Sequence, residues 1–154
     1  PIGGSNNGLF SLAAKLLAGN PFVSRIFAWR ARNPAIVKEL MDRTGSKIKP
    51  EAYDQYAILA RNRRHVSSAL GMMANWNLRG LNGALPKLST PLLLLTGEKD
   101  TMIPASDGQK VSQLVPGAHL INMENLGHLL HEESPEDVAK LISAFADEIL
   151  AKSK

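Results

Sequence analysis

The chain has 154 residues, of which 44% are hydrophobic and 21% are charged, a composition typical of one globular domain with its own core. It contains no cysteine, which excludes disulfides and thiolate metal sites. The net charge of +4 comes from dispersed basic residues, and their one cluster, at 61–65, adjoins a predicted amphipathic helix, so no nucleic-acid partner is expected.

No membrane or export segment is visible in the sequence. No apolar run approaches the roughly 20 residues that a membrane helix needs. Residues 1–8 have neither the basic region nor the apolar region of a signal peptide. We therefore expect a cytoplasmic protein without a membrane span.

The first half of the chain is predicted to form short helices, because it lacks the alternation of a strand. Two helices begin with an Asn-Pro pair, in which Asn caps free backbone N–H groups and Pro suits the first helical position. Gly45 stands where a left-handed residue should end the second of them. The predicted starts are Asn20-Pro21 and Asn33-Pro34, and two further helices are predicted over 49–62 and 64–76.

The pattern changes after Trp76. Residues 77–90 are predicted to form a linker broken by Gly and Pro, with periodic leucines. The run PLLLLTG at 91–97 is short, apolar and bounded by Pro and Gly, which favours a central parallel strand. The later predicted elements are a helix from Pro104 to about Val115, a strand over 118–124, and a last helix with Ser134 as its N-cap and Pro135 as its first residue.

The second half of the chain therefore has the β-α-β-α order of a parallel-sheet unit. Two parallel strands, the first of them a run of leucines, need neighbours on both edges and cover on both faces. We expect this unit to associate with the missing half of a larger fold or with another copy of the chain.

Each predicted strand is followed by a residue suited to acid–base chemistry. Asp100 follows the first strand and His128 follows the second, and neighbouring parallel strands bring such loops together. A carboxylate beside an imidazole fixes its tautomer and stabilises the imidazolium formed during proton transfer. Taken singly, Asp100 could cap the turn before Pro104 and His128 could be a structural loop residue. Taken together they favour a catalytic pair, in the order of the last two members of a Ser-Asp-His triad.

A second histidine, His131, lies close to the Ser134 helix cap, and we interpret it as a surface or hydrogen-bonding residue. The stretch HLLHEE at 128–133 lacks the histidine pair at i and i+4 that characterises a helical zinc motif. No metal ligand and no cofactor are therefore expected.

The segment GEKD-x-x-x-P, together with VPGAHLINMENLGH and EESPEDVAKLISAF, resembles the C-terminal part of the α/β-hydrolase superfamily. The resemblance covers about residues 86–150 and implies that Asp100 and His128 are catalytic. It also implies that residues 1–85 form a helical cap and that 86–154 form the last β-α-β-α part of the hydrolase core.

A narrower resemblance extends over nearly the whole chain. The patterns HV-x-x-AL-x-MMA-x-W and GHL-x-HEE look like those of the magnesium-chelatase accessory proteins of bacteriochlorophyll synthesis. This resemblance implies a photosynthetic bacterium as the source and an association with magnesium insertion into protoporphyrin.

One departure from the hydrolase pattern limits what the chain can do alone. No G-x-S-x-G occurs in the sequence, and the nearest stretch, GGSNN at 3–7, ends in Asn and follows no predicted strand. Without a nucleophile, Asp100 and His128 cannot carry out acyl transfer. We therefore expect a fragment that is inactive alone and whose complete form hydrolyses an ester-like bond.

Cap residues are candidates for substrate binding. Met72, Met73 and Trp76 form an apolar group whose flexible thioethers and broad indole suit a large flat ligand such as a porphyrin. The alternative is that they are core between cap and sheet. The rival to the enzyme is accordingly a non-catalytic porphyrin-binding protein on a hydrolase fold.

Overall fold

The computed structural model describes residues 20–78 and 80–152. These residues form two compact units. One unit comprises Asp42–Ile48 and residues 80–152, and the other comprises residues 20–41 and 49–78. The GGSNN stretch at 3–7 and the start of the predicted cap lie outside the described residues. The division of the chain into a cap over 1–85 and a core over 86–154 stays a prediction.

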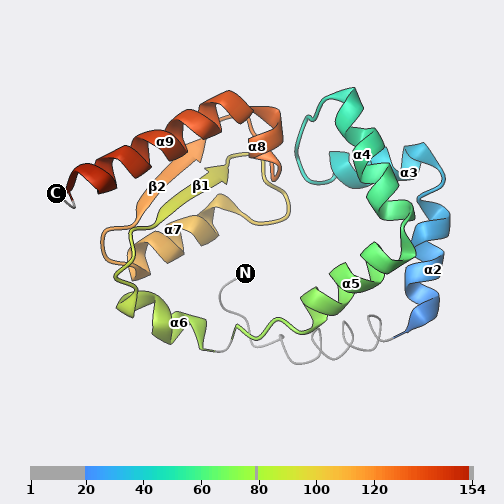
Figure 1. Ribbon diagram of the computed structural model, residues 1–154, viewed down its shortest axis with the longest axis horizontal. Coiled ribbons are helices and arrows are strands. Elements are labelled where there is room, and N and C mark those ends of the chain that lie inside the picture. The colour runs from blue at the N-terminus through green and yellow to red at the C-terminus, as the bar shows by residue number, and fades with distance from the viewer. Residues whose placement is uncertain (1–19, 79, 153–154) are drawn as a thin grey trace. The chain divides into compact units, whose positions relative to one another are not determined.

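Four helices make up most of the helical unit (Figure 1). Both Asn-Pro starts are confirmed: the side-chain oxygen of Asn20 accepts the N–H of Phe22 at 2.9 Å, and that of Asn33 accepts the N–H of Ala35 at 3.0 Å. Buried Val37, with Ala31 and Ala57, forms the small core between these helices. The helices are α2 (Pro21–Arg30), α3 (Pro34–Asp42), α4 (Pro50–Arg61) and α5 (Arg63–Ala74).

The other unit contains the predicted β-α-β-α order. Strand β1 (Leu93–Gly97) pairs in parallel with β2 (His119–Met123), and Leu93 lies opposite His119 while Gly97 lies opposite Met123. Helix α7 (Ala105–Leu114) connects the strands, and α9 (Pro135–Lys152) lies on the other side of them in Figure 1. The Phe145 ring of α9 packs edge-on against His119, with 5.2 Å between ring centroids.

Three short helical elements lie in segments for which the sequence predicted no helix. The linker predicted over 77–90 contains α6 (Leu81–Ala84) and the 3₁₀ helix η1 (Leu85–Lys87), and η1 contacts α7. Helix α8 (Leu130–Glu133) precedes α9, and its Leu130 side chain is buried. All three are too short to show helical periodicity in the sequence.

The sheet of the described residues has two strands, so each strand has one edge without a hydrogen-bonded neighbour there. Residues 93–96 of β1 are only half-buried, although the sequence of β1 is that of a central strand. None of the described helices combines the length and the apolar character needed to cross a bilayer.

The segment Arg43–Lys47 passes very close to the loops that follow the strands. Gly45 has a φ of +77°, which favours glycine, and a Cβ there would collide with the carbonyl oxygen of Lys99. A Cβ on Gly127 would collide in turn with the backbone of Gly45 and Ser46. Glycines at these two positions thus allow three backbone segments to meet.

Two alanine substitutions separate backbone strain from this collision. Gly117 has a similar φ of +73° but no atom within 4 Å of an added Cβ, so Gly117→Ala should lower the free energy of unfolding by about 1–2 kcal/mol. Gly45→Ala should cost about 1–3 kcal/mol more, because it adds overpacking to the same strain. Urea unfolding of both variants measures the difference, and equal losses would show that the crossing tolerates a methyl group.

Candidate active site

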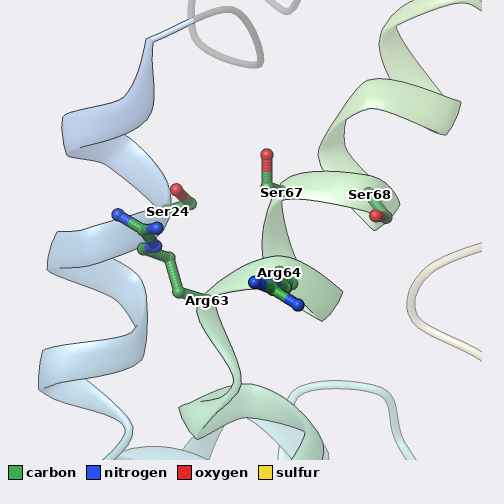
Figure 2. A pocket seen from close by; sticks show the side chains of 5 residues that line it. All are labelled: Ser24, Arg63, Arg64, Ser67 and Ser68. Atoms are coloured by element: carbon green, nitrogen blue, oxygen red, sulfur yellow. The ribbon is translucent and has the colours of Figure 1, made fainter.

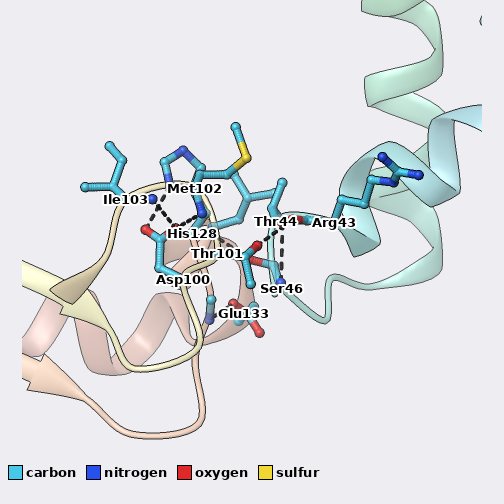
Figure 3. Close-up of polar contacts among 11 residues, drawn as sticks. Arg43, Thr44, Ser46, Asp100, Thr101, Met102, Ile103, His128 and Glu133 are labelled. Atoms are coloured by element: carbon cyan, nitrogen blue, oxygen red, sulfur yellow. Dashed lines mark hydrogen bonds and ion pairs between the residues drawn. The ribbon is translucent and has the colours of Figure 1, made fainter. Parts of the chain in front are cut away.

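Asp100 lies in the loop after β1 and uses both carboxylate oxygens. Its Oδ1 accepts the backbone N–H groups of Met102 at 2.8 Å and Ile103 at 2.9 Å. Its Oδ2 lies 2.9 Å from Nδ1 of His128 (Figure 3). The two interpretations of Asp100 are therefore compatible, because the turn contacts aim the second oxygen at the imidazole.

His128 lies in the loop between β2 and α8. The parallel register places Gly97 opposite Met123, so the loops that follow these two residues both start at the carboxyl end of the sheet. The His128 side chain is 36% exposed and that of Asp100 is 11% exposed. When Nδ1 carries the proton and donates it to Asp100, Nε2 keeps a lone pair that can accept a proton from a reacting group.

Three polar residues that the sequence analysis did not single out surround these loops: Thr44, Ser46 and Glu133 (Figure 3). Thr44 and Ser46 are buried, and Glu133 is half-buried. Ser46 and Thr44 are more than 80 positions from His128 in the sequence, so no local pattern links them to it. Glu133 follows His128 closely, but acids in a first helical turn are ordinary.

His131 does not join the pair. It lies on α8 with its side chain 60% exposed, and its Nε2 is 3.8 Å from Oε1 of Glu132. Within residues 20–78 and 80–152, no group of three or more His, Asp or Glu side chains is arranged to hold a metal ion. The interpretation of His131 as a bystander stays a prediction.

The predicted substrate-binding residues lie in the helical unit. Met72 and Met73, in the last turn of α5, are 56% and 51% exposed, and Trp76, just beyond it, is 60% exposed. Ala74, in the same turn, is buried. The three side chains are thus not part of that unit's core, and their role in binding stays a prediction.

A pocket of about 380 Å³ lies between α2 and α5 in the same unit (Figure 2). Two arginines and three serines line it, and a guanidinium group can bind an anionic group such as a carboxylate. Arg64, Ser68 and Met72 follow one another at intervals of four residues, which places them along one side of α5. The lining residues are Ser24, Arg63, Arg64, Ser67 and Ser68.

Comparison with known proteins gives the class. Residues 2–141 match the Alpha/beta hydrolase family, so the chain belongs to that family. The esterase EaEST from Exiguobacterium antarcticum shares the fold with a TM-score of 0.59 and 16% identity, over 82% of this chain and 48% of the esterase.

Among curated proteins, the magnesium-chelatase 30 kDa subunit of Rhodobacter capsulatus is 31% identical over 134 residues, which are 87% of this chain and 47% of the subunit. The uncharacterized hydrolase YugF of Bacillus subtilis (strain 168) is 34% identical over 61 residues, which are 40% of this chain and 22% of that protein. The chain thus spans about half the length of the chelatase subunit. Its two parallel strands and flanking helices are part of an α/β-hydrolase fold.

Substitution of the acid should change the protonation pattern of the imidazole. In Asp100→Asn the amide offers both a donor and an acceptor to Nδ1, so the preference for a proton on Nδ1 should weaken. Long-range ¹H–¹⁵N spectra, recorded where imidazole is neutral, should show Nδ1–H in the wild type and a mixture in the variant. The His131 ring is the internal control, and an unchanged His128 tautomer would mean that Asp100 does not set it.

Proposed function

We propose that Asp100 and His128 are the carboxylate and the histidine of a Ser-His-Asp triad in a hydrolase of ester-like bonds that serves magnesium-porphyrin or bacteriochlorophyll synthesis. The observation that carries this proposal is the 2.9 Å contact between Asp100 Oδ2 and His128 Nδ1 at the carboxyl ends of two parallel strands. The family and the 31% identity to a magnesium-chelatase subunit support the chemistry and the setting.

In this mechanism Nε2 of His128 takes the proton of a serine hydroxyl as that oxygen attacks the acyl carbon. Asp100 holds the ring in position and stabilises the imidazolium, which then returns the proton to the leaving group. Attack of water on the acyl-enzyme repeats the proton transfers and releases the acid. We assign the serine and the oxyanion hole to the part of the hydrolase fold that this chain does not span, because the sequence has no G-x-S-x-G.

The sheet also bears on which partner the chain needs. Within residues 20–78 and 80–152, β1 and β2 each have one edge without a hydrogen-bonded neighbour. These edges and the half-buried leucines of β1 favour association with the rest of a hydrolase fold, or with a second copy of the chain. Only the first of these partners supplies the nucleophile.

Turnover of a chromogenic ester tests the triad. The rate of ester hydrolysis with the chain alone should not exceed the rate in buffer, and a protein that also contains the N-terminal half of the fold should be active. In that protein Asp100→Asn and His128→Ala should each lower turnover by about 10⁴-fold, and the double variant by little more, because the residues act as a unit.

The control in this series is His131→Ala, which should lower turnover by less than about tenfold, since its ring lies outside the pair. If His131→Ala were as damaging as His128→Ala, a site with two histidines would replace the triad. Hydrolysis by the chain alone that is lost in His128→Ala would reveal a nucleophile within it.

A second candidate function is a non-catalytic porphyrin-binding protein. The surface of α5 favours it, since exposed Met72 and Met73 lie near Trp76 at one end and the pocket with Arg63 and Arg64 lies toward the other. Apolar side chains suit the face of a tetrapyrrole, and guanidinium groups suit its carboxylates.

Fluorescence titration with protoporphyrin tests this candidate. The double variant Met72→Ala/Met73→Ala should weaken binding by about tenfold or more, because it removes two apolar contacts of roughly 1 kcal/mol each. Ile58→Ala, on α4 and 60% exposed, is the matched control and should not change the affinity. Porphyrin binding without ester turnover, in a protein that also contains the N-terminal half of the fold, would favour the carrier over the enzyme.

A further inference from the structure

The loop that carries His128 is held from outside itself. Three consecutive backbone N–H groups, of Gly127, His128 and Leu129, donate to acceptors elsewhere in the unit. Their acceptors are Oε1 of Glu133 at 2.7 Å, the carbonyl of Thr44 at 3.2 Å and Oγ of Ser46 at 2.8 Å. A loop with all three donors satisfied in this way has little freedom to move the imidazole.

The same segment also holds the Asp100 loop. The carbonyl of Thr44 accepts the N–H of Thr101 at 3.4 Å, and the Thr101 hydroxyl donates to the carbonyl of Arg43. Thr101 directly follows Asp100 in the chain, as Leu129 follows His128. One short segment is therefore bonded beside both members of the pair.

Glu133 closes this arrangement. Its Oε2 accepts the N–H of Lys47 at 2.8 Å while its Oε1 accepts that of Gly127, so one carboxylate bridges the segment and the His128 loop. Hydrogen bonds from N–H groups to a carboxylate are charge-assisted and stronger than neutral ones. Both oxygens of Glu133 accept backbone N–H groups, so the carboxylate acts on the backbone that carries the ring.

We propose that Glu133 and Ser46 are positioning residues of the Asp100–His128 pair, which they fix through the segment Arg43–Lys47. This inference rests on the catalytic role proposed for the pair. A carboxylate–imidazole contact tolerates only small displacements before its alignment is lost, and rigid support of the backbone is what preserves it.

NMR of the chain itself can measure the tautomer of His128 and the exchange of its ring proton, and this test needs no nucleophile or substrate. In Glu133→Gln the amide group turns a donor toward one of the two N–H groups, so one bridge must break. The Nδ1 proton of His128 should then exchange with solvent about tenfold faster or more, and its tautomer should shift toward that of Asp100→Asn. Glu136→Gln, an exposed acid of α9, is the matched control and should keep the wild-type spectrum.

Ser46 gives a second, milder series. Ser46→Ala removes only the acceptor of the Leu129 N–H, and Ser46→Thr keeps a hydroxyl there. The alanine variant should show faster exchange of the His128 ring proton, and the threonine variant should restore protection. This series decides the matter if Glu133→Gln does not fold.

A purely structural role gives a different result. Glu133→Gln and Ser46→Ala would then lower the melting temperature while the folded protein kept the wild-type tautomer and exchange rate of His128, and the proposal would be overturned. In a protein that also contains the N-terminal half of the fold, a positioning role predicts that Glu133→Gln and Ser46→Ala lower kcat by about 10–100-fold with little change in KM. The NMR result stands whether or not hydrolysis is found, so failure of the enzyme assignment and failure of this proposal are distinguishable.

Discussion

The parallel register of β1 and β2 is the constraint on which the candidate site depends. Because Gly97 lies opposite Met123, both loops begin at the carboxyl end of the sheet and on neighbouring strands, so short loops are enough to bring them into contact. A slip of one residue would turn every side chain of one strand to the other face and move one loop along the sheet. The contact between the carboxylate of Asp100 and the imidazole of His128 therefore depends on how the two strands pair.

The parts of this arrangement that the sequence predicted are those with local causes. The Asn20 and Asn33 caps depend on the next two residues, and the strand at 93–97 depends on an unbroken apolar run between Pro and Gly. Asp100 and His128 could be paired because parallel topology leaves few other places for the ends of consecutive strands. Their contact is a geometric outcome of the fold, while their catalytic role stays a proposal.

The parts that the sequence did not reveal depend on contacts between distant segments. Ser46 and Leu129 are separated by 83 positions and Lys47 and Glu133 by 86, and neither pair belongs to a recognisable pattern. The short helix α8 was missed for another reason, since four residues cannot display helical periodicity. The exposure of Met72 and Met73 was equally out of reach, because methionine is used both in cores and at adaptable surfaces.

The path of the chain through the two units has a consequence for exchange of the helical part between related proteins. The chain leaves the helical unit after Met41, contributes Asp42–Ile48 to the strand-containing unit, and returns at Lys49. A graft that replaced residues 20–78 as one block would also replace the stretch that is bonded beside Asp100 and His128. Exchange of the helical part thus requires two separate replacements, of residues 20–41 and of residues 49–78, with the seven native residues Asp42–Ile48 retained between them.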